Sequence, residues 1–150
     1  MVTLTKREFL MVATGSAAAA LMGMPAIALG QEKAAARAAE FLGGATAKEG
    51  GITLEMPEIA ENGNTVPLTV RVDMPATEQS YVESLMVLAD GNPEPGVATF
   101  HFTPLSGTQE ASTRMRLAKT QNVIAIAKLN DGSFMRTETL VKVTIGGCGG

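Results

Sequence analysis

The sequence has very few of the residues from which active sites and metal centres are usually built. Its 150 residues include no tryptophan, one tyrosine, one histidine (His101) and one cysteine (Cys148). A zinc site of histidine and cysteine ligands needs three or four such residues, and an intrachain disulfide needs two cysteines, so both are excluded. A serine–histidine–aspartate triad would depend on His101, with no nucleophile-elbow motif to support it. We therefore expect no catalytic residues, no metal and no cofactor.

Charge is also scarce, since 18% of the residues are charged. Twelve lysines and arginines stand against 15 aspartates and glutamates, which gives a net charge of −3. This mild acidity argues against a nucleic-acid or anionic-membrane partner, because such a partner needs a clustered basic face. The 45% of hydrophobic residues is enough for a core, and the length suits one domain.

The first 28 residues are typical of an export signal. Lys6 and Arg7 precede a weakly hydrophobic stretch that contains no charge between Glu8 and Glu32, and the small residues after Pro25 predict cleavage at Ala28. The string from Thr5 to Leu10 resembles a twin-arginine signal with Lys6 in place of the first arginine, and the general secretory route also accepts a basic start. An uncleaved membrane anchor is the alternative, because about 20 uncharged residues can span a bilayer.

The rest of the chain is predicted to be mostly β-strand. An Ala-rich helix is expected from Glu32 to Leu42, with Gly43 and Gly44 ending it. From Ile52 onward, apolar and polar residues alternate with period two, and Asn-Gly, Asp-Gly and similar turns separate the segments. About seven short strands and one short helix predict an all-β fold, an immunoglobulin-like β-sandwich over residues 29–145. The turn Asn130-Asp131-Gly132 predicts a hairpin between residues 123–129 and 134–145.

Two predicted strands are apolar on both faces, namely Leu85–Leu88 and Val123–Ala127. In a two-layer sandwich one face of each sheet normally meets water. Either the helix or another protein must cover the second face of these strands, and both can be true. We predict that the two strands form part of an interface with another protein. His101 is expected to be a surface or interface residue.

The C-terminus places the one cysteine between two pairs of glycines. Gly146, Gly147, Gly149 and Gly150 have no side chains with which to pack, so residues 146–150 are predicted to be a flexible arm bearing Cys148. No basic residue neighbours the thiol in the sequence, and an arm of glycines cannot hold a catalytic base around it. The thiol is therefore interpreted as a point of covalent attachment. The alternative is an exported immunoglobulin-like binding module whose Cys148 forms an interchain disulfide.

The terminal Gly-Gly-Cys-Gly-Gly resembles the end of SoxY, the carrier subunit of the periplasmic thiosulfate-oxidising (Sox) multienzyme system. The pentapeptide is highly specific in that position. The likeness covers roughly residues 30–150, and Lys6 in the signal departs from the family in a feature of export. Other segments that are similar to the family are Pro57–Gly63 with Val66-Pro67, Asn92-Pro93 with Ala98-Thr99-Phe100, Thr113–Ala118, and Val141–Ile145.

The resemblance implies a non-catalytic carrier that holds sulfur intermediates of thiosulfate oxidation on Cys148. It implies a c-type cytochrome that oxidatively couples thiosulfate to this cysteine, and a hydrolase with a dimanganese centre that releases sulfate. A molybdenum-containing sulfane dehydrogenase is implied in systems that possess one. It also implies a heterodimer with SoxZ, a second small β-sandwich protein, and a periplasmic location.

Overall fold

The computed structural model describes residues 26–147, with side chains from Leu29 onward. This part of the chain contains one α-helix, one short 3-10 helix and nine strands. The elements in chain order are α2 (Ala26–Leu42), β1 (Ala47–Glu49), β2 (Ile52–Glu55), β3 (Ile59–Asn62), β4 (Val66–Val72), β5 (Val82–Ala89), β6 (Gly96–His101), η1 (Pro104–Ser106), β7 (Glu110–Met115), β8 (Gln121–Leu129) and β9 (Phe134–Ile145).

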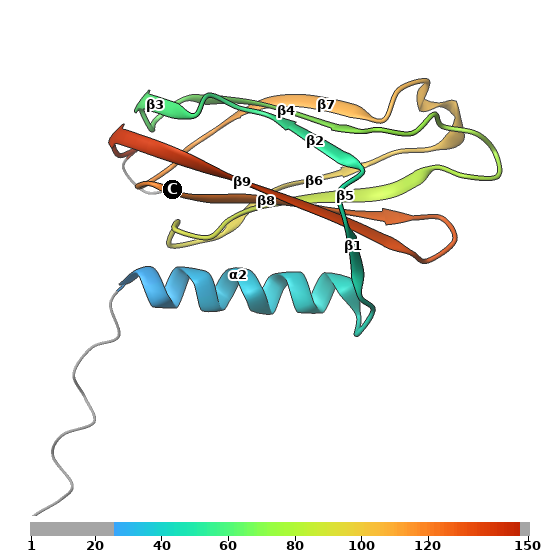
Figure 1. Cartoon of the computed structure of the whole chain (residues 1–150), viewed down its shortest axis with the longest axis horizontal. Coiled ribbons are helices and arrows are strands. Elements are labelled where there is room, and N and C mark those ends of the chain that lie inside the picture. The colour runs from blue at the N-terminus through green and yellow to red at the C-terminus, as the bar shows by residue number, and fades with distance from the viewer. Residues whose placement is uncertain (1–25, 148–150) are drawn as a thin grey trace, which may run out of the picture.

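Two sheets and one helix form three layers (Figure 1). The larger sheet has the order β1-β9-β8-β5-β6, and β3 also pairs with β9; the smaller sheet has the order β2-β4-β7. Helix α2 lies on the face of the larger sheet that points away from the smaller one. The predicted all-β sandwich with one N-terminal helix is therefore confirmed.

The strands β1 and β3 were not evident from the alternation of residues. They contain three and four residues, and both pair in parallel with β9, at Ala47↔Phe134 and Ala60↔Val143. Segments this short show no period of their own, so contact with the long strand β9 decides their conformation. They pair with the two ends of the edge that β9 would otherwise expose to other chains, at residues 134–136 and 142–145.

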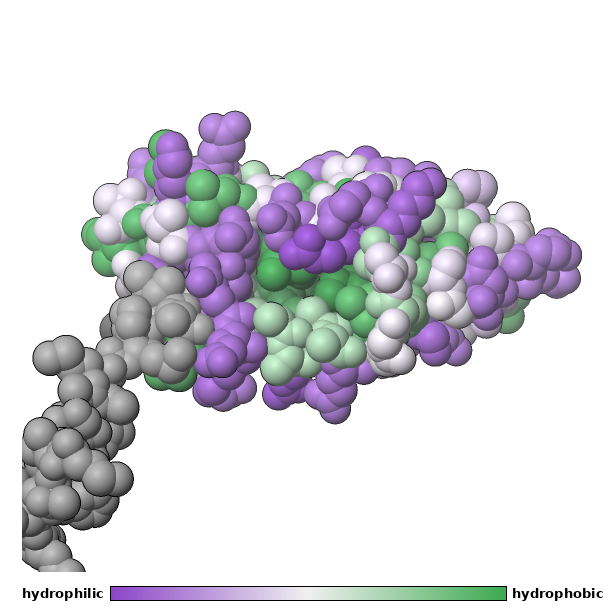
Figure 2. All heavy atoms as spheres, turned by 60° about the horizontal axis from the view of Figure 1, so that its bottom comes forward, coloured by the Kyte–Doolittle hydropathy of each residue, from purple (hydrophilic) through white to green (hydrophobic). Residues whose placement is uncertain are grey.

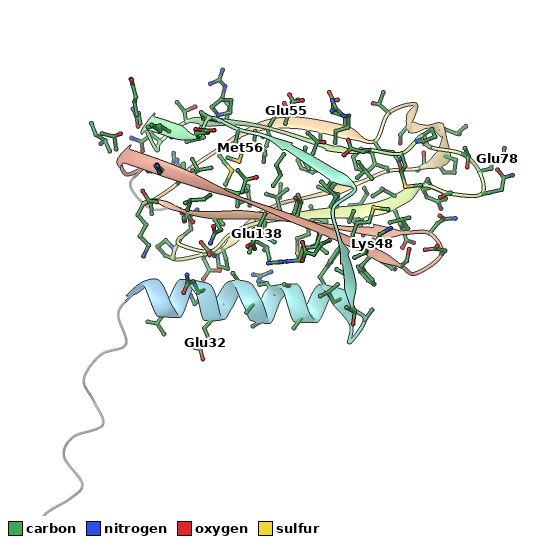
Figure 3. All side chains as sticks on the ribbon, viewed as in Figure 1. Glu32, Lys48, Glu55, Met56, Glu78 and Glu138 are labelled. Carbon is green, nitrogen blue, oxygen red and sulfur yellow. The ribbon has the colours of Figure 1, made fainter. Side chains whose placement is uncertain are left out.

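The main core lies between the two sheets and is built from alternate residues of their strands. In β4 the odd-even pattern is regular, because Leu68 and Val70 are fully buried while Pro67 and Arg71 are exposed. Met56, after β2, also packs against this core and points into the space between the sheets (Figure 3). The predicted hairpin between β8 and β9 is confirmed, and Gly132 in its turn has a φ of 83°, a value that favours glycine.

A second core lies between the larger sheet and α2. The sheet residues Met86, Leu88, Ile124, Ile126 and Phe134 pack against Ala38, Phe41 and Leu42 of the helix and against Ala47. The rings of Phe41 and Phe134 meet edge to face, with centroids 5.9 Å apart and planes at 78°. The helix itself thus covers the second apolar face. Figure 2 shows this side of the molecule, where hydrophobic residues are visible in a hollow below a group of hydrophilic ones.

This arrangement corrects the predicted partner interface. No residue of Leu85–Leu88 or Val123–Ala127 is more than 9% exposed in the single chain. One face of these strands packs against the smaller sheet and the other packs against α2, so neither face is available to another protein. A strand that is apolar on both faces is predicted to be buried on both, but the sequence does not show whether the same chain or another protein covers the second face.

The helix also begins earlier than predicted, at Ala26 instead of Glu32. Gly30 is buried, and a side chain there would come within 2.6 Å of the Asp90 carbonyl oxygen. The predicted end is confirmed, since Gly43 and Gly44 follow Leu42 with φ values of 58° and 89°. The cleavage site predicted at Ala28 lies inside the helix. Residues 1–25 of the predicted export signal lie outside the described residues. The helices in the part of the chain that the structure describes do not have the length and hydrophobicity that a bilayer-spanning helix needs.

Candidate functional site

The structure divides the predicted arm into two parts. Cys148, Gly149 and Gly150 lie outside the described residues, whereas Gly146 and Gly147 lie inside them. The end of β9 is on the same side of the molecule as β3 and the start of α2 (Figure 1). The candidate site is therefore the place where the chain leaves β9, which we call the tail root and define as Gly146 and Gly147 with the segments that contact them.

Backbone hydrogen bonds hold the tail root to two loops. The Gly147 N–H donates to the Leu117 carbonyl oxygen at 2.9 Å, and the Leu117 N–H donates to the Gly63 carbonyl oxygen at 2.8 Å. The Gly63 N–H donates in turn to the Ile145 carbonyl oxygen at 2.7 Å. Three segments that are far apart in the sequence are thus joined at the end of β9.

The three glycines at this junction allow the backbones to approach closely. A Cβ atom on Gly147 would lie 2.6 Å from the carbonyl oxygen of Gly63, and real Cβ contacts are essentially never this short. A Cβ atom on Gly146 would overlap the carbonyl oxygen of Ala118, and one on Gly63 would overlap that of Leu117. Any other residue at these positions would force the backbones apart.

These contacts correct the prediction of a flexible arm that starts at Gly146. Gly147 is buried and hydrogen-bonded, and Gly146 lies against Ala118. Glycine has two physical roles, conformational freedom and close approach of backbones, and sequence alone does not distinguish them. At Gly146 and Gly147 the second role applies. The predictions for Cys148, Gly149 and Gly150 stay predictions, because these residues lie outside the described part.

Two buried amide side chains hold the loop that receives the tail. Asn92 and Gln121 are each only 4% exposed. The Asn92 amide nitrogen donates to the Arg116 carbonyl oxygen at 2.9 Å, and its amide oxygen accepts from the Ala118 N–H at 3.0 Å. The same oxygen accepts from the Gln121 amide nitrogen at 2.8 Å. The bonds to Arg116 and Ala118 bracket Leu117, which accepts the hydrogen bond from Gly147.

Gln121 completes this network. Its amide nitrogen also donates to the Lys119 carbonyl oxygen at 3.0 Å, and its amide oxygen accepts from the Gly91 N–H at 2.7 Å. Within the described residues no buried side-chain nitrogen or oxygen lacks a hydrogen-bond partner. Satisfied buried networks of this kind specify one local geometry. Sequence analysis named Asn92 only within a segment that is similar to the family, and it did not single out Gln121, because a buried amide has no sequence pattern by which to find it.

The start of α2 lies beside the same loops. Lys33 donates to the Pro93 carbonyl oxygen and to the Glu94 carboxylate, both at 3.0 Å. This hydrogen bond and the charge of Lys33 lower the pKa of Glu94 below its ordinary value of 4.5. A pocket of about 320 Å³ lies between the helix and the loops, and its lining residues are Leu29, Gly30, Lys33, Gly91, Pro93, Ala118 and Lys119.

Sequence analysis also did not single out the two basic residues near the tail root. The segment that accepts the hydrogen bond from Gly147 has the exposed Arg116 on one side and the half-buried Lys119 on the other. These residues are about 30 positions away from Cys148 in the sequence, so no local pattern relates them to the tail.

His101 is exposed at the end of β6, where it pairs with Ser84, as predicted for a surface residue. Among the described residues no group of three or more histidines, cysteines, aspartates or glutamates is placed to hold a metal.

Comparison with known families assigns the chain. The sequence profile described as "Sulfur oxidation protein SoxY" matches residues 38–148, a range that ends on the only cysteine. The chain belongs to the SoxY family. Membership of this family implies partners from the Sox system, such as SoxZ. Comparison with curated proteins gives no match.

Solved structures agree with this assignment. The sulfur carrier protein SoxY from Chlorobium limicola f thiosulfatophilum has 34% sequence identity and a TM-score of 0.64, over 76% of this chain and 98% of that one. A superoxide reductase (neelaredoxin) from Ignicoccus hospitalis has 17% identity and a TM-score of 0.56, over 63% and 80% of the two chains. A putative superoxide reductase from Thermotoga maritima has 18% identity and a TM-score of 0.54, over 65% and 87%. The last two share only the fold.

Proposed function

We propose that this SoxY-family protein carries sulfur intermediates of thiosulfate oxidation as covalent adducts on Cys148 and presents them to partner enzymes. The observation that most supports this proposal is that the family match extends to Cys148, the only cysteine of the chain. The fold supports it too, because the residue before Cys148 is held at the end of the sandwich, outside the two cores.

The chemistry proposed for Cys148 begins with the oxidative coupling of its thiol to thiosulfate. The Cys148 sulfur forms a sulfur–sulfur bond to the outer sulfur of thiosulfate, which gives a cysteine S-thiosulfonate, and the thiol proton is lost. Two electrons leave in this step, and a c-type cytochrome accepts them one at a time. The protein itself supplies the thiol and no catalytic group.

Later steps regenerate the thiol. Water attacks the terminal sulfonate sulfur, which releases sulfate and leaves a persulfide on Cys148. A molybdenum-containing sulfane dehydrogenase, where the host has one, oxidises the outer sulfur of the persulfide to a sulfonate with three waters, and six electrons and seven protons are released. A second hydrolysis then returns the thiol. A hydrolase with a dimanganese centre is the proposed catalyst of both hydrolyses.

The proposal includes a location and a permanent partner. The first 28 residues direct export, through the twin-arginine or the general secretory route, and the carrier acts in the periplasm. A SoxZ-like β-sandwich protein forms a heterodimer with it. The interface of this heterodimer lies away from Leu85–Leu88 and Val123–Ala127, since α2 and the smaller sheet bury these strands.

The test of the carrier proposal is the variant Cys148→Ser. Serine cannot form the sulfur–sulfur bond, so thiosulfate-dependent reduction of the cytochrome in a reconstituted system should fall to the background rate. The melting temperature should not change, because Cys148 belongs to the predicted flexible arm and changes away from buried groups rarely alter stability. Wild-type protein alkylated at Cys148 is the matched control and should lose activity equally.

Two outcomes would contradict the proposal. Turnover by the serine variant would show that Cys148 is not the attachment point. A quantitative interchain disulfide in the intact mass of the purified protein, without sulfur adducts on the monomer, would favour the binding-module alternative instead.

A further inference from the structure

We propose that close backbone contacts among Gly63, Gly146 and Gly147, supported by Asn92 and Gln121, anchor the tail root, so that the chain that bears Cys148 leaves the fold at one fixed place beside residues 116–119. This inference rests on the proposed carrier function and adds to it five positioning residues. None of the five is proposed to touch the sulfur substrate. Their role is to determine where the chain that bears the thiol leaves the fold.

The first step of the argument is the geometry of the backbone. Gly147 donates to Leu117 at 2.9 Å, and the loop that contains Leu117 is hydrogen-bonded to Gly63 at 2.8 Å. Consecutive Cα atoms are about 3.8 Å apart, so the Cα of Cys148 lies within that distance of a fixed Gly147. An arm that was free from Gly146 would instead allow the thiol to sweep a much larger volume.

The second step is that the contact admits only glycine. Gly147 is buried, and a Cβ atom there would lie 2.6 Å from the Gly63 carbonyl oxygen and 2.9 Å from its carbon. Both of these are backbone atoms, which cannot rotate away as the end of a flexible side chain can. Because the φ angles of Gly63, Gly146 and Gly147 are not positive, close approach and not backbone conformation is what requires glycine there.

The third step is that the receiving loop is itself fixed. Asn92 forms hydrogen bonds to Arg116, Ala118 and Gln121, and Gln121 forms a further bond to Lys119. Both amides are 4% exposed and each of their nitrogen and oxygen atoms has a hydrogen-bond partner, so movement of the loop would leave buried polar groups unpaired. The chain therefore leaves the fold beside the surface on which Arg116 and Lys119 lie.

The decisive experiment compares Gly147→Ala with Gly149→Ala. The two glycines flank Cys148 symmetrically, so they should behave alike if the whole tail were a uniform flexible arm. The anchor predicts that only the variant at 147 changes the protein. A nitroxide label on Cys148, the only cysteine, should give a narrower electron paramagnetic resonance spectrum in Gly147→Ala than in wild type, while Gly149→Ala keeps the wild-type line shape.

Hydrogen exchange provides a second readout that does not depend on sulfur chemistry. In Gly147→Ala the amides of residues 147 and 63 should exchange at least about tenfold faster than in wild type, because their hydrogen bonds to Leu117 and Ile145 are broken. The amides of the central strand β8 should keep their protection. Faster exchange over the whole chain would mean general destabilisation and would count against an anchor.

A second variant tests the supporting network without adding volume. Asn92→Asp keeps the oxygen that accepts from Ala118 but removes the nitrogen that donates to Arg116, and it should also narrow the spectrum of the Cys148 label. The matched control is Asn64→Asp, since Asn64 is exposed and its side chain forms none of the described hydrogen bonds. Equal spectra for Asn92→Asp and wild type would contradict the role of Asn92.

The carrier assay separates the anchor from the proposed function. With an anchored root, Gly147→Ala lowers kcat/KM for the carrier in thiosulfate-dependent cytochrome reduction, while its rate of alkylation by iodoacetamide stays within twofold of wild type. If Gly147→Ala and Gly149→Ala give the same spectra and exchange rates, the anchor is wrong, whatever the carrier assay shows. If the spectra differ but wild type itself supports no turnover, the anchor stands and the carrier function fails.

Discussion

Replacing Leu88 by alanine tests whether α2 covers the second face of the larger sheet. Leu88 is fully buried on that face, in the cluster with Phe41 and Leu42 of the helix. A buried leucine-to-alanine change costs about 2–5 kcal/mol, because the transfer free energy of the side chain is lost and a cavity remains. For a domain of this size we expect a fall of roughly 10 °C in melting temperature.

The assay is urea unfolding of the isolated chain, followed by far-ultraviolet circular dichroism. Leu105→Ala is the matched control, because it removes the same atoms from a side chain that is 95% exposed, and its unfolding free energy should stay within about 0.5 kcal/mol of wild type. The result that would refute the reasoning is a neutral Leu88→Ala in the isolated chain that becomes destabilising only in the heterodimer. In that case a partner, and not α2, would cover the face.

Two further predictions concern stability. The pKa of Glu94 is lowered on folding by Lys33, so Glu94 stabilises the fold above pH 4.5, and this contribution is lost as the pH falls below that value. The melting temperatures of wild type and Glu94→Gln should therefore differ at pH 7 and converge near pH 3. A difference that grew on acidification would contradict the role of Glu94. Gln109→Leu should lower the unfolding free energy by about 1–3 kcal/mol, since the buried Gln109 amide accepts from the Val82 N–H and donates to the Met74 carbonyl oxygen at 2.7 Å. Urea titration of Gln109→Leu beside the exposed control Gln79→Leu measures this loss, and equal midpoints for the two variants would refute it.

Local patterns in the sequence were sufficient to predict most of the architecture. The alternation in Leu68, Val70 and Val72 depends only on which face of a strand is buried, and it survives in the structure because the period of a strand is two. The glycines after Leu42 ended the helix as predicted, because positive φ angles favour glycine. The family, too, was evident from the C-terminal pentapeptide and from the segments between residues 57 and 145 that are similar to the family.

Only the tertiary structure decided what covers the apolar strands and what the first tail glycines do. The hydrophobicity of Leu88 and Ile126 predicts that both side chains are buried. Which element covers them depends on the packing of α2 against the sheet, which is a long-range contact. The role of Gly147 depends in the same way on Gly63 and Leu117, which lie 84 and 30 positions earlier in the chain. A glycine next to a cysteine predicts freedom when only its neighbours in sequence are considered. In the folded chain the same missing side chain lets three backbones meet, because there is no Cβ atom to keep them apart.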